Sequence, residues 1–374
     1  MKWLHTADWQ IGRVHAFASA GDGQDPNPAL AAARFGAVER IAALARAEAV
    51  DAVFVAGDVF DHQGVADTTL RRLVNAMQGY TGPWLLLPGN HDAALASSVW
   101  TRLERLAILP DNVHLLLEPA VRTFPELGLA VLPAPLTHKH THDDLSAWFD
   151  SATTPEGLAR VGIAHGSVAG VLPEAADSAN PIAGDRAASA GLDYLALGDW
   201  HGTRQVDART WYSGTPEQER FKDNDPGNVL LVELDAPGAV PRVSARRIGR
   251  FRWHESSRRI DGATALDDLA AELGGFGADD VLRLSLAGLL DMAGHARLAD
   301  ILEGARARLH VMEADVSAVH LEPTEADLAA LRMDGVLAGL VEELRGMQET
   351  DGSPVAGEAL KILFDVVRRE GSGA

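Results

Sequence analysis

The sequence contains no cysteine and has no apolar run long enough to cross a membrane. The absence of cysteine excludes disulfide bonds, thiolate nucleophiles and cysteine-ligated zinc sites. The N-terminal segment reaches Asp8 within the length of one strand, which leaves no room for a signal peptide or an anchor. We therefore expect a cytoplasmic protein with no membrane association, in which any metal is held by His, Asp, Asn or Gln side chains.

Basic residues are scarce relative to acidic ones. The chain has 33 Lys and Arg against 53 Asp and Glu, which gives a formal net charge of -20. Because nonspecific binding to nucleic acid is largely phosphate neutralisation, this balance argues against a protein that coats nucleic acid unaided. If DNA is the substrate, a local groove, bound metals or a partner must supply the positive potential.

Hydrophobic residues are abundant enough for a large core. The chain has 374 residues, of which 47% are hydrophobic and 23% charged, as in a globular protein with a catalytic domain and at least one smaller domain. Over residues 1–235, apolar strands alternate with polar loops and helical segments. This βαβ rhythm predicts a sheet with helices on its faces.

Polar side chains follow five of the predicted strands. They are Asp8 and Gln10, then Asp58 and Asp61, then Asn90, His91 and Asp92, then His165, and finally Asp199 and His201. A single cluster of this kind is usually a turn, but five in succession at strand ends, where α/β sheets place their chemistry, predict a metal site. Asp58 is its expected centre, because a carboxylate has two oxygens and can bridge two cations.

These motifs resemble those of the calcineurin-like metallophosphoesterases: D-x-H, G-D-x-x-D, G-N-H-[DE], a lone His and G-H-x-H. The resemblance covers residues 1–235 and implies an α/β (α+β) fold, a β-sandwich flanked by helices. It implies that one metal is held by Asp8, Gln10, Asp58 and His201, and a second by Asp58, Asn90, His165 and Asp199. His91 matches the general acid of the family, Asp92 would orient His91, and Asp61 closes the G-D-x-x-D motif.

Two positions depart from the family pattern. Gln10 and Asp199 each stand where the family usually has His. Both side chains can still ligate through oxygen, and an oxygen-richer shell favours Mn²⁺ or Mg²⁺ over Zn²⁺. We therefore expect two divalent ions, Mn²⁺ before Mg²⁺, although decay of the site is an alternative explanation of the two departures.

The mechanism follows from this site. Two neighbouring cations would lower the pKa of a shared water and stabilise an in-line displacement at phosphorus. The resulting hydroxide would attack, and protonated His91 would donate to the leaving oxygen. No protein nucleophile is needed, in agreement with the absence of cysteine.

Within the family, three segments resemble the SbcD-type subunits of DNA double-strand-break repair nucleases: Leu4–Trp9, Gly57–Asp61 and Tyr212–Pro216. This resemblance implies a Mn²⁺-dependent DNA exonuclease and endonuclease that works with an SbcC-like ATPase of the ABC type, which carries a coiled coil. It also implies a nuclease domain over residues 1–250, an α+β capping domain over 251–322 and a helical tail over 323–374.

Beyond residue 235 the sequence indicates less about function. An apolar stripe from Leu328 to Leu344 would dock on the partner, or pack on its own domain or in a homodimer. Residues 250–259 look irregular, and residues 348–357 look like a linker.

We expect solvated histidines at His138, His140 and His142. A basic cluster would contact the DNA backbone or form a solvated junction; it comprises Arg246, Arg247, Arg250, Arg252, Arg258 and Arg259.

Two other functions stay open from the sequence. The chain could be a small-molecule phosphodiesterase or phosphatase of the same superfamily, which the net charge of -20 favours. Alternatively, it could be a noncatalytic scaffold that uses a degenerate site to bind an ATPase.

Overall fold

The structure is a computed structural model that describes residues 1–17, 25–170, 179–222, 224–322 and 336–351, with 355–356, 359–360 and 362–363 beyond them. The chain divides into two compact units. The first contains residues 1–17 and 27–251, and the second contains the chain from Arg252 onward. The roles expected of the second unit, as a capping domain and a docking tail, stay predictions.

The first unit is built on two six-stranded sheets. In the first sheet the strand order is β14-β13-β1-β2-β3-β4, with β1 to β4 parallel and with β13 and β14 antiparallel to their neighbours. The bounds are β1 (Lys2–Thr6), β2 (Ala52–Ala56), β3 (Trp84–Leu87), β4 (Val113–Leu115), β13 (Asn228–Glu233) and β14 (Arg242–Arg247).

The second sheet has the order β11-β12-β10-β7-β6-β5. Its four central strands are parallel, and β5 and β11 pair antiparallel at the edges. The bounds are β5 (Arg122–Phe124), β6 (Leu129–Ala134), β7 (Ala159–His165), β10 (Tyr194–Gly198), β11 (Arg204–Gln205) and β12 (Thr210–Tyr212). A short pair, β8 (Ser167–Val168) with β9 (Pro181–Ile182), follows β7.

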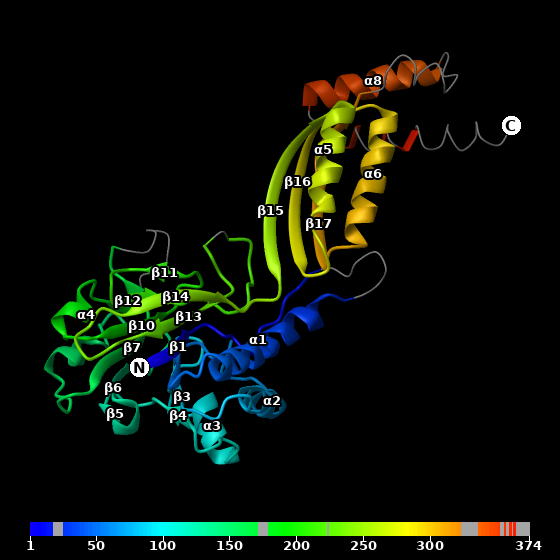
Figure 1. Cartoon of the computed structure of the whole chain (residues 1–374). Helices are drawn as coiled ribbons and strands as arrows, with labels where there is room; N and C mark the ends of the chain where they lie inside the picture. The colour runs from blue at the N-terminus through cyan, green and yellow to red at the C-terminus, as the bar shows by residue number, and fades with distance from the viewer. Residues whose placement is uncertain are drawn as a thin grey trace. The chain divides into compact units, whose positions relative to one another are not determined.

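The two sheets pack face to face. Because successive residues of a strand point to opposite sides, each sheet presents one face to the other sheet and its second face to the helices. Trp3, Phe54 and Tyr194 belong to the core between the sheets, whereas neighbouring residues such as Leu4 and Val53 face the helices. The first sheet is covered by α1 (Asn27–Ala47), α2 (Asp67–Met77) and α3 (Val99–Leu106) (Figure 1). The second is covered by η2 (Ala147–Ser151) and α4 (Arg186–Ser189), with η1 (Pro125–Leu127) beside β6. The expected sandwich flanked by helices is confirmed.

The covering helices follow from the sequence. In α2 the buried residues include Leu70, Leu73, Val74 and Met77, spaced as one face of a helix. The helix α3 begins at a capping box in which Ser98 and Thr101 satisfy each other's backbone N–H groups.

The second unit contains a parallel sheet, β15-β16-β17, with two helices packed on one face. Its elements are β15 (Arg252–Asp261), α5 (Gly262–Gly274), β16 (Asp280–Leu290), α6 (Met292–Arg306) and β17 (Val311–Leu321). The irregular segment predicted around residues 250–259 is therefore wrong from Arg252 onward. Only Trp253 and Ile260 of β15 are buried, so this edge strand lacks the apolar alternation that marks a half-buried strand.

The helix α8 (Val336–Asp351) contains part of the predicted apolar stripe. Val341 is buried against Leu321 and Leu360, whereas Leu337 and Leu340 are exposed. Leu328 and Leu331 lie outside the described residues. The linker predicted from Gln348 is wrong as far as Asp351, since the helix continues through Gln348 and Glu349, which are good helix formers, to Asp351.

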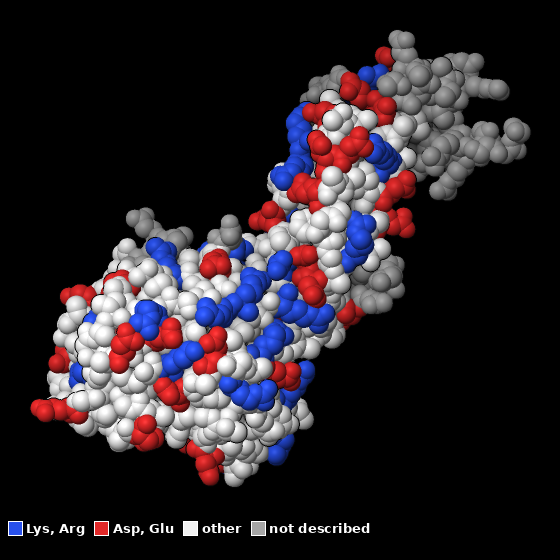
Figure 2. All heavy atoms as spheres, in the orientation of Figure 1, with Lys and Arg blue, Asp and Glu red and all other residues white. Residues whose placement is uncertain are grey.

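The predicted basic cluster is divided between the two units. Arg246, Arg247 and Arg250 belong to the first unit and the other three to β15. Several of the six have acidic partners: Arg258 binds Glu272 at 2.9 Å, and Arg259 binds Asp261 at 2.7 Å. Figure 2 shows basic and acidic side chains interspersed over the viewed face.

Among the residues that the structure describes, no helix is both long and apolar enough to span a bilayer.

Candidate metal centre

The motif residues meet where strands of both sheets end. From the first sheet, Asp8 and Gln10 follow β1, Asp58 follows β2 and Asn90 follows β3; from the second, His165 ends β7, and Asp199 and His201 follow β10. One ligand atom each from Asp8, Asp58 and His165 lies within 4.8 Å of the other two, and all three side chains are buried. Carboxylate and imidazole groups gathered in this way are suited to a divalent cation.

On one side of the centre, donors surround His165. Its Nε2 lies 2.8 Å from Asn90 Oδ1, 3.5 Å from Asp58 Oδ1 and 3.8 Å from Asp199 Oδ1. The other ring nitrogen, Nδ1, donates to the carbonyl oxygen of Ala56 at 2.9 Å. This second hydrogen bond turns Nε2 toward the carboxylates, as outer partners do for metal-binding histidines.

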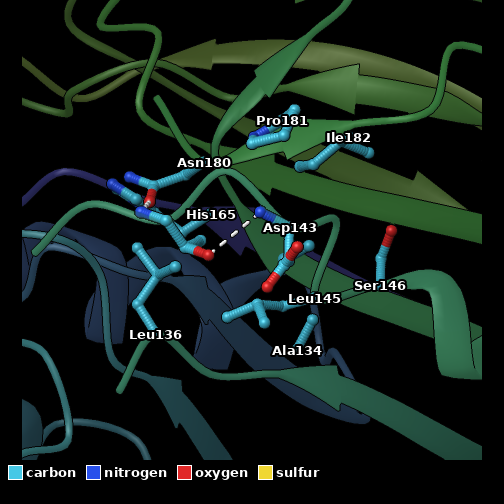
Figure 3. A pocket seen from close by; sticks show the side chains of 11 residues that line it. Ala134, Leu136, Asp143, Leu145, Ser146, His165, Asn180, Pro181 and Ile182 are labelled. Carbon is cyan, nitrogen blue, oxygen red and sulfur yellow. Dashed lines mark hydrogen bonds between the residues drawn. The ribbon is translucent and has the colours of Figure 1, made fainter. Parts of the chain in front are cut away.

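A hollow beside His165 is lined by Leu136, Asp143 and Asn180, among others (Figure 3). The wall is tied together by Asn180, whose Oδ1 accepts from the N–H of Thr141 at 2.9 Å and whose carbonyl accepts from Ser167 N at 3.0 Å. The loop that is anchored in this way carries three exposed histidines, as expected for solvated side chains: His138, His140 and His142.

On the other side of the centre, His201 Nε2 lies 3.9 Å from Asp8 Oδ1. Its Nδ1 lies 2.6 Å from Oε1 of the buried Glu219, which also binds Arg34 at 2.8 Å and Arg13 at 3.1 Å. Burial alone would raise the pKa of Glu219, but His201 and the arginines outweigh it and hold the pKa well below its ordinary value. Sequence patterns gave no signal for this group, because its partners are distant in the chain.

Gln10 does not present its oxygen to the centre. Its Oε1 accepts from Arg13 Nη1 at 2.7 Å, and its Nε2 lies 3.3 Å from His201 Nε2. The expectation that Gln10 ligates through oxygen therefore disagrees with this geometry. The reason is Arg13, which was not recognised as part of the site from the sequence.

His91 lies at the edge of the centre with 32% of its side chain exposed. Its backbone N–H donates to Asp58 Oδ1 at 2.9 Å, and its Nδ1 donates to the carbonyl oxygen of Asp61 at 2.7 Å. Its Nε2 lies 4.0 Å from Asp58 Oδ2. The Asp61 carboxylate is farther away, with Oδ1 at 3.9 Å from His91 Nδ1.

Asp92 does not orient His91, contrary to the sequence-based expectation. Its carboxylate accepts the backbone N–H groups of Gly89 at 2.6 Å and Phe60 at 3.0 Å. Asp92 is fully buried, and these two hydrogen bonds connect the loop that follows β2 with the loop that follows β3. Burial, with the nearby Asp58, raises its pKa to about 8.

The electrostatics of the centre favour a cation. Burial raises the pKa of Asp8 to about 6 and also raises the pKa of Asp199. Burial would lower the pKa of His165, but the carboxylates of Asp58, Asp8 and Asp199 raise it to about 9. The carboxylates thus stabilise a positive charge on His165, and they would stabilise a bound divalent ion in the same way.

The backbone at the centre is strained. Four of the motif residues have positive φ: Asp8 at 53°, Gln10 at 44°, Asp58 at 51° and Asp199 at 97°, a region that residues other than glycine seldom adopt. Glycine is required at two neighbouring positions. A Cβ at Gly57 would lie 2.2 Å from His165 Nδ1, and one at Gly89 would lie 2.2 Å from Asp58 Oδ1.

An α/β sandwich with buried carboxylates and imidazoles at its strand ends indicates a metal-dependent hydrolase. A family model described as calcineurin-like phosphoesterase matches residues 1–227, and the chain belongs to this family. Among solved structures, the chain is similar to TT1561 of Thermus thermophilus at 11% identity and a TM-score of 0.41, covering 66% of this chain and 98% of that one. A search of curated proteins gave no match.

Proposed function

We propose that the protein is a DNA phosphodiesterase of the SbcD type, an exonuclease and endonuclease of DNA repair that uses two divalent ions, preferably Mn²⁺. The hydrolytic part of this proposal is carried by the convergence of Asp8, Asp58 and His165, whose ligand atoms lie within 4.8 Å, in a chain of the phosphoesterase family. The choice of DNA is supported by the segments at Leu4–Trp9 and Tyr212–Pro216 that resemble SbcD-type subunits.

The residues present fit at least one divalent ion. Asp58, Asn90, His165 and Asp199 would hold a cation on one side of the centre, and Asp8, Asp58 and His201 would supply donors on the other. Divalent ions in such a site activate water and neutralise charge on a phosphoryl group. The strained Asp8 and Asp58 keep their carboxylates pointing into the site, because the surrounding sheets determine their backbone conformation.

His91 is the proton donor in this proposal. Its backbone N–H is fixed to Asp58, and its Nδ1–H is fixed to the Asp61 carbonyl, so that Nε2 lies 4.0 Å from Asp58 Oδ2 at the edge of the centre. The hydrogen bond from Nδ1–H to the carbonyl fixes the orientation of the ring, so that a proton on Nε2 can be delivered to a leaving oxygen.

The proposal is tested by degradation of linear duplex and single-stranded DNA with Mn²⁺, Mg²⁺ or a chelator. The wild type is compared with His91→Ala and with His62→Ala, a control because His62 is an exposed histidine in the loop that follows β2, next to Asp61. We expect metal-dependent cutting that falls by about 10²–10⁴-fold in His91→Ala and is retained in His62→Ala.

Two results would contradict the proposal. Hydrolysis of a chromogenic phosphodiester without any cutting of DNA would indicate a small-molecule enzyme. Failure of the protein to bind any divalent ion would indicate a noncatalytic scaffold.

We also propose an SbcC-like ABC-type ATPase as the partner, docked on α8. The exposed Leu337 and Leu340, three residues apart on one helical face, support this choice. Co-elution of the purified ATPase and this protein in gel filtration should be lost in the double variant Leu337→Lys, Leu340→Lys. Co-elution that survives in the variant would place the contact elsewhere.

A further inference from the structure

We propose that Arg13 locks the Gln10 amide so that Gln10 is not a metal ligand, and that the protein binds one divalent ion tightly beside His165 and a second one weakly beside His201. This inference rests on the metal chemistry of the proposed function. It assigns unequal roles to the two sides of the centre and makes Arg13 a positioning residue.

The orientation of the Gln10 amide follows from its neighbour. Arg13 Nη1 lies 2.7 Å from Gln10 Oε1, and a guanidinium has only donors, so the amide atom that faces it must be the oxygen. Arg13 cannot easily turn away, because its Nε also binds Glu219 at 3.1 Å and its Nη1 lies 3.3 Å from Asp61 Oδ1. Gln10 itself is 1% exposed, which leaves little room for another rotamer.

The other end of the amide is fixed by His201. Gln10 Nε2 lies 3.3 Å from His201 Nε2. His201 Nδ1 lies 2.6 Å from Glu219 Oε1 and 3.0 Å from Arg220 Nη2. When Nδ1 donates its proton to the carboxylate, the closer of the two, Nε2 keeps a lone pair that can accept from the amide. Turning the amide over would set NH₂ against the guanidinium and oxygen against the histidine lone pair, two repulsive contacts.

This lock divides the centre into unequal halves. Beside His165, four donors are already gathered, with the shortest separation 2.8 Å from Nε2 to Asn90 Oδ1. Beside His201, only Asp8, Asp58 and His201 remain. His201 Nε2 must give up the Gln10 amide before it can bind a cation, and the nearest Asp8 oxygen lies 3.9 Å from it. The charge of Arg13 adds repulsion toward a cation on this side. Fewer ligands and an adjacent positive charge both lower affinity there.

The test is a calorimetric titration of the metal-free protein with Mn²⁺, without DNA, on the wild type and on Gln10→Ala, Arg13→Leu and Arg13→Lys. We expect one tight site and one at least about tenfold weaker in the wild type. Gln10→Ala should weaken neither site. Arg13→Leu frees the amide to turn and should strengthen the weak site, whereas Arg13→Lys keeps a donor for Gln10 Oε1 and should retain the wild-type pattern.

An unchanged tight site serves as the control for folding in each variant. Two equally tight sites in the wild type, or loss of affinity in Gln10→Ala, would overturn the inference. Because the titration contains no DNA, a protein that binds metal unequally but cuts no DNA would contradict only the proposed function.

Discussion

At the scale of single residues, Asp58 connects the two sheets through its carboxylate. Its Oδ1 accepts the N–H of His91 at 2.9 Å and lies 3.5 Å from His165 Nε2. Asp58→Asn keeps the shape but removes the charge that attracts cations from both sides, so we expect metal content and turnover to be lost together. His91→Ala should lose turnover and keep its metal. Metal analysis and phosphodiester hydrolysis on the same samples check this split, and an active Asp58→Asn protein would rule out the site assignment.

His5 gives a prediction about pH. Its ring is fully buried, with Nδ1 2.9 Å from Tyr194 Oη and Nε2 3.2 Å from the Leu197 carbonyl oxygen. Burial lowers its pKa from 6.5 to about 3. Between these values the unfolded chain binds a proton that the folded protein does not, so acidification favours unfolding by about 1.4 kcal/mol per pH unit.

Replacing this histidine removes the proton uptake. In His5→Gln the free energy of unfolding should depend less steeply on pH below 6.5 than in the wild type, whatever the loss of stability at neutral pH. Urea unfolding with chelator at several pH values measures the two slopes. Equal slopes would show that His5 is protonated in the folded protein.

The identity of most site residues could be predicted, but their roles could not all be. Asp58, Asn90 and His165 follow apolar strands, and that local pattern is visible in one sequence. The orientation of Gln10 depends on Arg13, three residues away, and on His201, which contacts it across the fold. Glu219 likewise contacts Arg13 and His201 across the fold. Side-chain contacts between distant segments leave no periodic signal in the sequence.

At the scale of elements, the loop after β3 depends on Gly89. A Cβ there would lie 2.2 Å from Asp58 Oδ1 and 2.4 Å from Asp58 N, so Gly89→Ala must push the β2 and β3 loops apart. We expect loss of metal affinity by at least about tenfold. Gly64→Ala is the matched control, since its Cβ would meet only the His62 side chain at 3.4 Å. Calorimetric Mn²⁺ titration distinguishes them, and unchanged affinity in Gly89→Ala would show that the loops can move without harm.

The helix α8 contains glycines that no described residue requires. Within the described part of the chain, an added Cβ at Gly346 would meet no atom within 4 Å, and the same is true at Gly339. Because alanine loses less backbone entropy in a helix interior, each Gly→Ala change should stabilise the helix by about 0.5–1 kcal/mol. Thermal unfolding followed by circular dichroism should show a higher midpoint, and a lower one would mean that another chain approaches these glycines closely.

Elements with continuous apolar runs were predictable, and charged edge strands were not. The buried strands β2 and β3 are apolar throughout because both of their faces are covered. The strands β14 and β15 carry arginines on exposed positions, so their sequences resemble a solvated junction. Pairing with a neighbouring strand, rather than composition, makes them strands.

At the scale of the whole molecule, every proposed ligand belongs to the first unit. A chain that ends at Phe251 keeps the hydrogen bonds from Arg250 N and Phe251 N to Glu217, at 3.0 and 2.8 Å. We expect this shortened protein to fold and to bind Mn²⁺ like the full chain. Circular dichroism and metal titration provide the check. A folded but metal-free fragment would mean that the second unit contributes to the centre.

The centre also has a consequence for how the protein folds. Each sheet can form its own backbone hydrogen bonds without the other. The donors of the centre, however, are divided between the two sheets, so neither sheet alone contains a complete coordination shell. A cation therefore binds only when the two sheets are packed together. At free ion concentration [M] and dissociation constant Kd, binding adds RT ln(1 + [M]/Kd) to the stability of that packed state alone. In refolding, Mn²⁺ capture should be among the last events, and chelation should first loosen the contact between the sheets while leaving the strands within each sheet paired.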